Sequence, residues 1–458
     1  MAAMTMSNLS ITKPKISHNV AVIGAGAAGL TAARELRLEG HNVVVFERLS
    51  KIGGTWAYNP NTESDPLGID PNRKIILSSL YDSLRTNLPR ESMGYRAYPF
   101  VEAGLKDRDQ RRYPGHKEVL DYLEDYAREF RVSEMVRFET EVVRVGMVEG
   151  RKWEVKWRAL GKRIDVDEVF DAVVICNGHY TEPRLAYIPG IDEWPGKQMH
   201  SHNYRVPEPF RDQVVILIGS SASAADISRD IAGVAKEVHV ASRSSAALGK
   251  LPGYENIWLH SMIGSAHQDG SVAFQDGNIV QADVIMHCTG YKYHFPFLET
   301  NGIVNVDDNR VGPLYQHVFP PALAPWLSFV GLPWKVIPFP LCEYQSKWIA
   351  GVLSGRILLP SKEKMMESVK AFYTKLGASG MPKHYAHNMG TYQFEYNDWL
   401  AGRCGCAGTE EWRKQMYAAS SESKRIKPET YRDEWEDHEW ISQAHEDFKQ
   451  CGHLSESK

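Results

Sequence analysis

The chain has 458 residues, of which 43% are hydrophobic and 24% are charged, and its net charge at pH 7 is −4. This length gives room for two or three domains, and the near-neutral charge argues against nucleic acid or a membrane surface as a partner. No segment approaches the roughly 20 consecutive apolar residues of a membrane-spanning helix. Six cysteines in a chain of this length do not indicate a disulfide framework, and none of them form a C-x-x-C pair. This favours a reducing compartment, so we expect a cytoplasmic protein.

The first 18 residues are rich in Ser and Thr and contain no Arg. They lack the apolar core of a signal peptide and the arginines of a transit peptide. We therefore expect residues 1–18 to form a disordered leader.

A glycine-rich motif follows the apolar run 20–23, which is typical of a buried parallel strand. Gly24 permits a tight turn, Gly26 lets the backbone approach a pyrophosphate, and Gly29 lets a helix over 30–38 pack closely. The N-terminus of that helix favours the anion. A second strand over 43–46 ends in Glu47, whose carboxylate can accept hydrogen bonds from ribose hydroxyls. A glycine turn in an ordinary α/β unit would not explain Glu47, so the motif predicts a dinucleotide site.

A second glycine pair lies in the run Gly53-Gly54-Thr55-Trp56, and it again allows close approach of the backbone to a ligand. Here the sequence resembles the two-dinucleotide-binding flavoproteins, in which this pair contacts the flavin side of FAD. The resemblance implies FAD as the first cofactor. The residues that it assigns to FAD in addition to the glycine motif are Glu47, Arg48, Gly54, Thr55 and Trp56.

The next part of the chain shows alternating segments, such as 153–157, that predict antiparallel strands. Apolar and aromatic residues at helical spacing predict a helix over 117–130. Loops are expected over 59–72 and 106–112, and the charged tail after about residue 418 is helical in tendency.

A second dinucleotide motif begins with the apolar strand 214–218 and continues into a helix over 222–235. Its loop has one glycine, with small residues in place of the other two, and its next strand, 237–240, leads to Arg243. An arginine at this position can pair with a 2′-phosphate, whereas an acid would repel it. The motif therefore favours NADPH, the alternative being a surface arginine after a strand. The predicted coenzyme-binding residues are Gly219, Ser220, Ser221, Ala222, Ser223 and Arg243.

Between the two motifs, the segment from Trp194 to Tyr204 resembles the FxGxxxHxxxY/F fingerprint of the flavin-containing monooxygenases, with Trp194 in place of the usual Phe. The related Baeyer–Villiger monooxygenases end the fingerprint in Trp-Pro or Trp-Asp, and this chain does not. His200 and His202 belong to the fingerprint. On their own they would suggest a packed loop, and no convergent ligands support a metal site.

Three further segments resemble the same family. Residues 84–89 are similar to the segment with the active-site asparagine, which would be Asn87. Thr289 and Gly290, which are expected to bind cofactor, lie in a TGY element where two domains join. Residues 343–348 resemble the return to the FAD domain. The resemblance covers residues 18–445 and is strongest to the plant S-oxygenating branch, the alk(en)ylcysteine and glucosinolate S-oxygenases. The charged tail differs from the apolar membrane anchor of mammalian members.

The resemblance implies an α/β fold with two Rossmann-like domains, in which the NADPH domain (205–325) interrupts the FAD domain (19–204 and 326–458). NADPH would reduce FAD, and O2 would form a C4a-hydroperoxyflavin that bound NADP⁺ protects. A soft nucleophile would then attack the distal oxygen, so the protein binds and orients while the cofactor supplies the chemistry. Asn87 would be the catalytic side chain near the flavin.

We thus expect an enzyme that converts a small thioether into a sulfoxide, with an S-alk(en)yl cysteine such as S-allyl-cysteine, or its γ-glutamyl form, as first choice. A methylthioalkyl glucosinolate is the second, and indole-3-pyruvate or an amine would be the substrate in other branches. A disulfide reductase of this fold would need a C-x-x-C pair, which is absent. A non-catalytic nucleotide sensor would not consume NADPH and O2. The pair Cys404 and Cys406 could be half a metal site but has no matching half, so packing thiols are expected.

Overall fold

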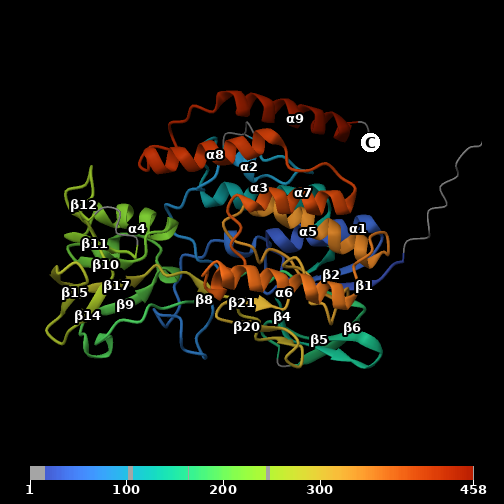
Figure 1. Cartoon of the computed structure of the whole chain (residues 1–458), viewed down its shortest axis with the longest axis horizontal. Helices are drawn as coiled ribbons and strands as arrows, with labels where there is room; N and C mark the ends of the chain where they lie inside the picture. Colours follow the sequence, from blue (N-terminus) through green and yellow to red (C-terminus); the bar gives the residue numbers. More distant parts are fainter. Residues whose placement is uncertain (1–15, 102–106, 163, 244–247, 457–458) are drawn as a thin grey trace, which may run out of the picture.

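The computed structural model describes residues 16–101, 107–162, 164–243 and 248–456. Most of the predicted leader, residues 1–15, lies outside this part of the chain. Figure 1 shows an elongated α/β protein with two sheet-containing units and a layer of C-terminal helices.

The first unit is built on a five-stranded parallel sheet in the order β22-β7-β1-β2-β3. Its strands are β1 (Asn19–Ile23), β2 (Asn42–Phe46), β3 (Val136–Arg137), β7 (Ala172–Ile175) and β22 (Leu327–Phe329). The central strands are buried on both faces. Val20 and Val22 pack in one core with α1 (Ala27–Glu39) and α5 (Pro338–Leu353), whereas Ala21 and Ile23 pack in another core.

The second core lies between this sheet and a mainly antiparallel sheet in the order β19-β4-β5-β6. The members of that sheet are β4 (Thr140–Val148), β5 (Lys152–Ala159), β6 (Asp165–Phe170) and β19 (Leu298–Glu299). The prediction of antiparallel strands around 153–157 is confirmed. The unit therefore has helices on one face of its parallel sheet and a second sheet on the other.

The second unit has a six-stranded sheet in the order β12-β13-β11-β10-β17-β9. Its strands are β9 (Lys197–His200), β10 (Val214–Ile218), β11 (Glu237–Ala241), β12 (Gly249–Lys250), β13 (Ile257–His260) and β17 (Val284–His287). Helix α4 (Ala222–Ala232) packs on this sheet. A small sheet of β14 (Ile263–Ala266), β15 (Ser271–Phe274) and β16 (Ile279–Gln281) packs nearby. The boundary at residue 204 stays a prediction, although β9 lies before it and pairs with β17.

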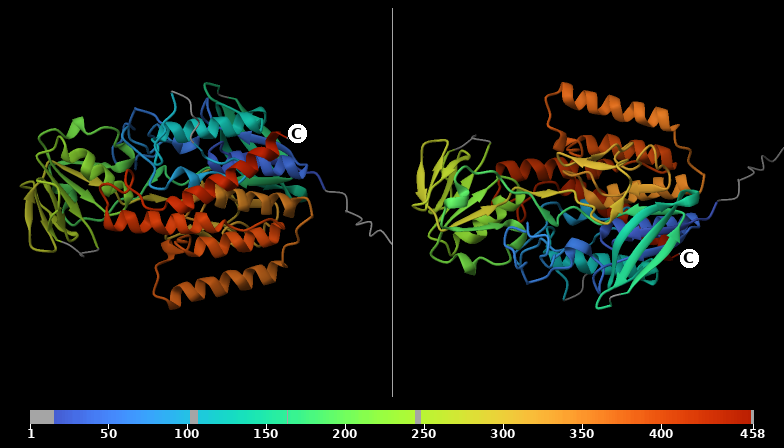
Figure 2. Two further views of the ribbon diagram at one scale, coloured as in Figure 1. Left: turned by 90° about the horizontal axis from the view of Figure 1, so that it is seen from above. Right: turned by 90° about the horizontal axis from the view of Figure 1, so that it is seen from below.

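Short strand pairs and helices complete the described part of the chain. The strand pairs are β8 (Glu182–Pro183) with β18 (Tyr291–Lys292), and β20 (Asn305–Asp307) with β21 (Arg310–Gly312). The remaining α-helices are α2 (Arg90–Met93), α3 (His116–Glu129), α6 (Lys362–Ala378), α7 (Tyr392–Cys404), α8 (Glu411–Ile426) and α9 (His438–Glu456). Figure 2 shows the second unit at one end of the molecule and the helices α5 to α9 over the first unit. Among the helices in the described ranges, none is long and apolar enough to cross a membrane.

Candidate active site

The first glycine motif forms the turn between β1 and α1, and two of its glycines have no room for a side chain. Gly24 has a φ of 104°, and a Cβ on it would lie 2.7 Å from the carbonyl oxygen of Cys176. A Cβ on Gly29 would lie 1.8 Å from the carbonyl oxygen of Gly24. These positions require glycine for packing of the turn, whether or not a ligand is bound.

The third position, Gly26, is half-buried and faces the second glycine pair, because a Cβ on it would lie 3.5 Å from the Cα of Gly54. It precedes α1 and leaves the first turn of that helix without a side-chain cap. The second glycine pair lies against it, because Gly53 N–H donates to the carbonyl of Ala25 at 3.0 Å. A Cβ on Gly54 would lie only 3.0 Å from the Cα of Gly26. Two glycine segments and an uncapped helix N-terminus thus meet where a pyrophosphate is expected.

Glu47 lies at the carboxyl end of β2, beside the same turn. Its side chain is buried and accepts hydrogen bonds from the N–H groups of Ala25 at 2.7 Å and Leu49 at 2.8 Å. Burial raises the pKa of this carboxyl above its ordinary value, and the backbone donors oppose that shift. Arg48 turns away and lies 3.6 Å from Glu141, Nε to Oε1. Thr55 and Trp56 are half-buried in the short helix that follows the glycine pair.

The second glycine motif repeats the geometry of the first. Gly219 has a φ of 121°, and its Cβ would lie 2.6 Å from the carbonyl oxygen of Cys288. Helix α4 begins directly after Ser221, whose side chain does not cap it. Ser242 Oγ donates to Ser220 Oγ at 2.9 Å, so the end of β11 lies beside the loop. Arg243 follows as an exposed side chain, and Ala222 and Ser223 form the first turn of α4.

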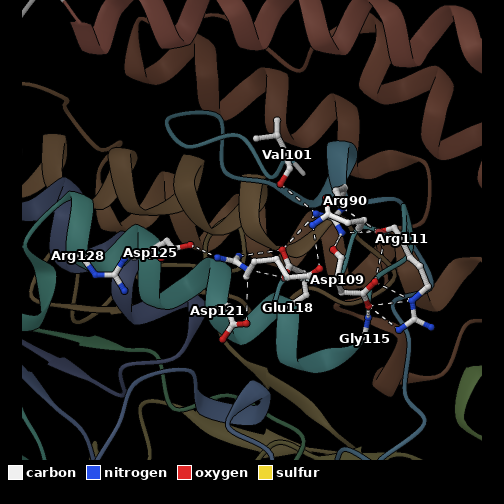
Figure 3. A network of polar contacts seen from close by, with 11 residues as sticks. Arg90, Val101, Asp109, Arg111, Gly115, Glu118, Asp121, Asp125 and Arg128 are labelled. Carbon is white, nitrogen blue, oxygen red and sulfur yellow. Dashed lines mark hydrogen bonds and ion pairs between the residues drawn. The ribbon is translucent and has the colours of Figure 1, made fainter. Parts of the chain in front are cut away.

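The segment that contains Asn87 is held by hydrogen bonds to the backbone carbonyls of residues 113 and 114. Thr86 N–H donates to the carbonyl of Pro114 at 2.9 Å, and Arg85 Nε donates to that of Tyr113 at 2.9 Å. Arg90 is buried and points into a polar network at the start of α3 (Figure 3). The side chain of Asn87 is exposed and has no hydrogen-bond partner in the part of the chain that the structure describes.

Figure 3 shows the polar contacts that satisfy the buried guanidinium of Arg90. Arg90 donates to the carbonyl oxygens of Val101, Asp109 and Arg111, at 3.2, 2.5 and 2.6 Å. Glu118 lies 3.5 Å from Arg90 and receives two hydrogen bonds from Arg108, at 2.7 and 3.1 Å. Buried charges are tolerated when they are paired and hydrogen-bonded in this way.

A surface cavity of about 530 Å³ lies beside the Asn87 segment. It is lined by residues 82–85 and by residues between 107 and 121, with carboxylates and cationic groups on the same walls. Its volume is in the range of small-molecule sites.

The two fingerprint histidines, His200 and His202, form hydrogen bonds with other groups of the protein. His200 Nδ1 accepts from the N–H of His202 at 3.0 Å, and its Nε2 lies 3.0 Å from the carbonyl oxygen of Gly290. This arrangement needs a neutral ring with the proton on Nε2, and burial lowers the pKa of His200 to about 3. Gly290 has a φ of 80°, and Thr289 Oγ1 donates to the carbonyl of Arg184. The fingerprint and the TGY element are therefore hydrogen-bonded at the junction of the two units.

Among the residues that the structure describes, no metal site is found around these histidines or cysteines. His202 pairs instead with buried Glu63, Nε2 to Oε1 at 3.2 Å. In the described ranges, no group of three or more His, Cys, Asp or Glu could hold a metal ion. Cys404 and Cys406 are free, half-buried thiols.

The structure also shows contacts that the sequence analysis missed. Asp226 and Asp230 of α4 contact Tyr81 and Ser83, which precede Asn87, and Asp226 contacts Arg432 from the C-terminal region. The two acids are four residues apart on the helix after the second glycine motif. This spacing places them on one face of the helix, so the sequence could have predicted a shared contact surface there. Arg432 gave no local signal, because its partner is 206 residues away in sequence.

Two sheets, one parallel and one mainly parallel, each have a glycine turn and an uncapped helix at the carboxyl ends of their parallel strands. This arrangement defines the class of proteins that bind two dinucleotides. Within that class, the chain belongs to the flavin-binding monooxygenase-like family, whose model matches residues 17–251 and 254–406. This membership confirms the predicted enzyme class and the flavin cofactor.

Individual relatives support the same family. The chain is 65% identical over 442 residues to the flavin-containing monooxygenase FMO GS-OX-like 4 of Arabidopsis thaliana, covering 95% of this chain and 98% of the relative. It is similar to the structure of S-allyl-L-cysteine S-oxygenase from Allium sativum, with 63% identity, a TM-score of 0.94, and coverage of 96% of this chain and 100% of that chain. The resemblance to the plant S-oxygenating branch is thus confirmed.

The fold is also similar to that of OTEMO in complex with FAD and NADP, at 16% identity and a TM-score of 0.53, covering 79% of this chain and 91% of that chain. The predicted pair of cofactors, FAD and NADPH, agrees with these findings.

Proposed function

We propose that this protein is an NADPH- and O2-dependent S-oxygenase that converts a small S-alk(en)yl cysteine, such as S-allyl-cysteine, into its sulfoxide. The observation that carries the proposal is the similarity to S-allyl-L-cysteine S-oxygenase, with a TM-score of 0.94 over 96% of the chain. In the overall reaction, NADPH, a proton, O2 and the thioether give NADP⁺, water and the sulfoxide. One oxygen atom goes to sulfur and the other to water.

FAD, when bound, would supply the chemistry that activates O2 and transfers one oxygen atom to sulfur. The chain would bind the cofactors and the substrate and orient them for the reaction. Gly26, Gly54 and the N-terminus of α1 would hold the FAD pyrophosphate, with Glu47 on its ribose. The N-terminus of α4 would hold the coenzyme pyrophosphate, and Arg243 its 2′-phosphate. The amide of Asn87 is exposed and has no partner among the described residues, so it can donate to and accept from groups at the reaction site.

Substrate chemistry favours sulfur over nitrogen. A thioether is uncharged at physiological pH, whereas a simple amine is mostly protonated and cannot act as a nucleophile. The cavity beside the Asn87 segment has Asp82 and Asp107 as well as Arg85 and Lys117 on its walls. Groups of both signs suit the ammonium and carboxylate of an amino acid.

A methylthioalkyl glucosinolate is the second candidate. An indole-3-pyruvate or amine substrate is the remaining alternative within the family. We further propose a cytoplasmic location, which the free thiols at the five described cysteines support. A fluorescent fusion found mainly on the endoplasmic reticulum would refute that location.

The test of substrate class is a comparison of kcat/KM for S-allyl-cysteine, a methylthioalkyl glucosinolate and a tertiary amine, with products identified by mass spectrometry. We expect the highest value for S-allyl-cysteine, with its sulfoxide as product. A higher value for the glucosinolate would select the second candidate. Turnover of the amine alone, with neither thioether oxidised, would overturn the S-oxygenase proposal.

A further inference from the structure

The segment between α8 and α9, residues 427–437, contacts both nucleotide-binding units. Within this segment, the guanidinium of Arg432 contacts both Asp226 and Thr86. Arg432 Nη2 and Nη1 donate to the two carboxylate oxygens of Asp226 in α4, at 2.6 and 3.3 Å. Its Nε donates to the carbonyl oxygen of Thr86 at 3.0 Å. One side chain thus joins the coenzyme-binding helix to the peptide group directly before Asn87.

Helix α4 contacts the same part of the chain through two acids. Tyr81 OH donates to Asp226 Oδ2 at 3.3 Å, and Ser83 Oγ donates to Asp230 Oδ2 at 2.8 Å. Asp226 and Asp230 are four residues apart, so they lie on one face of α4. The helix that begins at the second glycine motif is therefore bonded along that face to the chain leading to Asn87.

Charge and shape make Arg432 suited to this contact. Its side chain is 17% exposed and that of Asp226 is 23% exposed. Burial alone would lower the pKa of Arg432, but the contacts with Asp226 outweigh burial and the pKa is raised. The planar guanidinium meets a carboxylate with two donors and keeps a third for the carbonyl, which a lysine ammonium cannot do in the same geometry.

We propose that Arg432 is a positioning residue for oxygenation, which sets Asn87 relative to the coenzyme-binding unit. The peptide group is planar, so the carbonyl oxygen of Thr86 and the nitrogen of Asn87 lie in one rigid plane. A donor that fixes the Thr86 carbonyl therefore fixes where the Asn87 side chain begins. The inference rests on the proposed role of Asn87.

The segment itself does not depend on Arg432 for its place. Arg85 pairs with Asp433 at 2.8 Å, and Arg112 pairs with Asp437 through two hydrogen bonds of 2.6 and 2.7 Å. On the other side, Glu429 receives Arg229 at 2.7 Å. Replacement of Arg432 should therefore remove one connection and leave the fold and the segment in place.

The first test is kinetic and uses Arg432→Gln in the full-length holoenzyme. We expect unchanged FAD content and a fall of roughly tenfold in sulfoxide formed per NADPH consumed, because small displacements at a reacting centre have effects of this size. The missing product should reappear as hydrogen peroxide, since the two electrons of NADPH then reduce O2 without oxygen transfer. Asn87→Ala should show the same loss, and Arg432→Lys should be intermediate.

The second test needs no turnover. Hydrogen–deuterium exchange of residues 81–88 should be faster in Arg432→Gln and in Asp226→Asn than in the unchanged protein, and the double variant should add little to either. Arg425→Gln is the matched control, because Arg425 is exposed and, among the described residues, pairs only with Glu422 on its own helix. It should leave exchange and the product ratio unchanged.

Unchanged exchange and an unchanged product ratio in Arg432→Gln would overturn the proposal. So would an equal loss in Arg425→Gln, which would indicate a general surface effect. Failure of the proposed function is a separate result. If the unchanged protein forms no sulfoxide, exchange of residues 81–88 still shows whether Arg432 couples the two units.

Discussion

Single glycines decide the geometry of both nucleotide-binding turns. Gly24 and Gly219 have positive φ values of 104° and 121°, and each would place a Cβ within 2.7 Å of a carbonyl oxygen from the neighbouring strand's end. Cys176 and Cys288 supply those oxygens after β7 and β17. The second motif keeps this glycine and replaces the other two with Ser221 and Ala224. The tight turn is thus the feature for which glycine is needed in both units.

Gly29→Ala should abolish FAD binding in most of the purified protein and lower its melting temperature by several degrees. The added Cβ would lie 1.8 Å from the carbonyl oxygen of Gly24, so the turn must move. The measurements are the flavin-to-protein absorbance ratio and thermal unfolding. Gly402→Ala is the control, because Gly402 lies in α7 with open space around it. That change should leave flavin unchanged and stabilise the helix slightly, by up to about 1 kcal/mol. A fully flavinated Gly29→Ala protein would contradict the packing argument.

Arg243→Ala should weaken NADPH selectively, with a rise in its KM that corresponds to about 1.5–3 kcal/mol, the range for hydrogen bonds to charged groups. The KM for NADH should not change, because NADH has no 2′-phosphate. Lys236→Ala is a matched control, since Lys236 is exposed and lies directly before β11, whereas Arg243 lies after its other end. An equal loss with both coenzymes would remove Arg243 from the 2′-phosphate site.

At the scale of elements, local sequence patterns predict well what local forces determine. The predicted strand 214–218 is β10, and the predicted helix 117–130 is α3 shifted by one residue. Apolar runs and glycine turns are sufficient there. The helix predicted over 222–235 ends at Ala232, because a turn with Gly233 follows.

Contacts between distant elements could not be predicted from such patterns. The fingerprint strand β9 lies in the second sheet, beside β17, although it precedes the predicted boundary at 204. The placement of Asp226 between Tyr81 and Arg432 depends on three segments that only the fold brings together. The sequence therefore predicted both glycine motifs and the Asn87 segment but not the connection between them.

The junction at β9 predicts a pH dependence of stability. The pKa of His200 is lowered from 6.5 to about 3, first by burial and also by His202 and His287, with Glu63 acting in the opposite direction. Between pH 6.5 and about pH 3, His200 therefore binds a proton in the unfolded chain but not in the folded chain. The stability contributed by the neutral ring is complete above pH 6.5 and falls as the pH decreases toward 3.

His200→Gln should therefore lose about 1 kcal/mol less unfolding free energy than the unchanged protein when the pH falls from 7.5 to 5.5. Glutamine can still donate to the Gly290 carbonyl but does not titrate. The measurement is denaturant unfolding at the two pH values. Another buried histidine, His317, whose pKa is also lowered by burial, contributes equally to both proteins. Equal pH dependence in the two proteins would show that His200 does not titrate in this way.

At the scale of the whole molecule, the second unit lies at one end (Figure 2), and hydrogen bonds join it to the rest of the chain at several places. One is the junction of β9 and the TGY element, and another is the segment 427–437. Oxygen transfer requires the coenzyme, the flavin and the substrate in fixed relation. Contacts between the units are therefore expected to affect how much NADPH oxidation leads to product.

The most direct test of the account is the fate of molecular oxygen. Purified protein with FAD, NADPH and S-allyl-cysteine is supplied with ¹⁸O2, and the sulfoxide is analysed by mass spectrometry while NADPH consumption is followed. We expect one ¹⁸O atom in each sulfoxide and close to one sulfoxide per NADPH. NADPH oxidation that gives only hydrogen peroxide with every thioether offered, or a sulfoxide without ¹⁸O, would contradict the account.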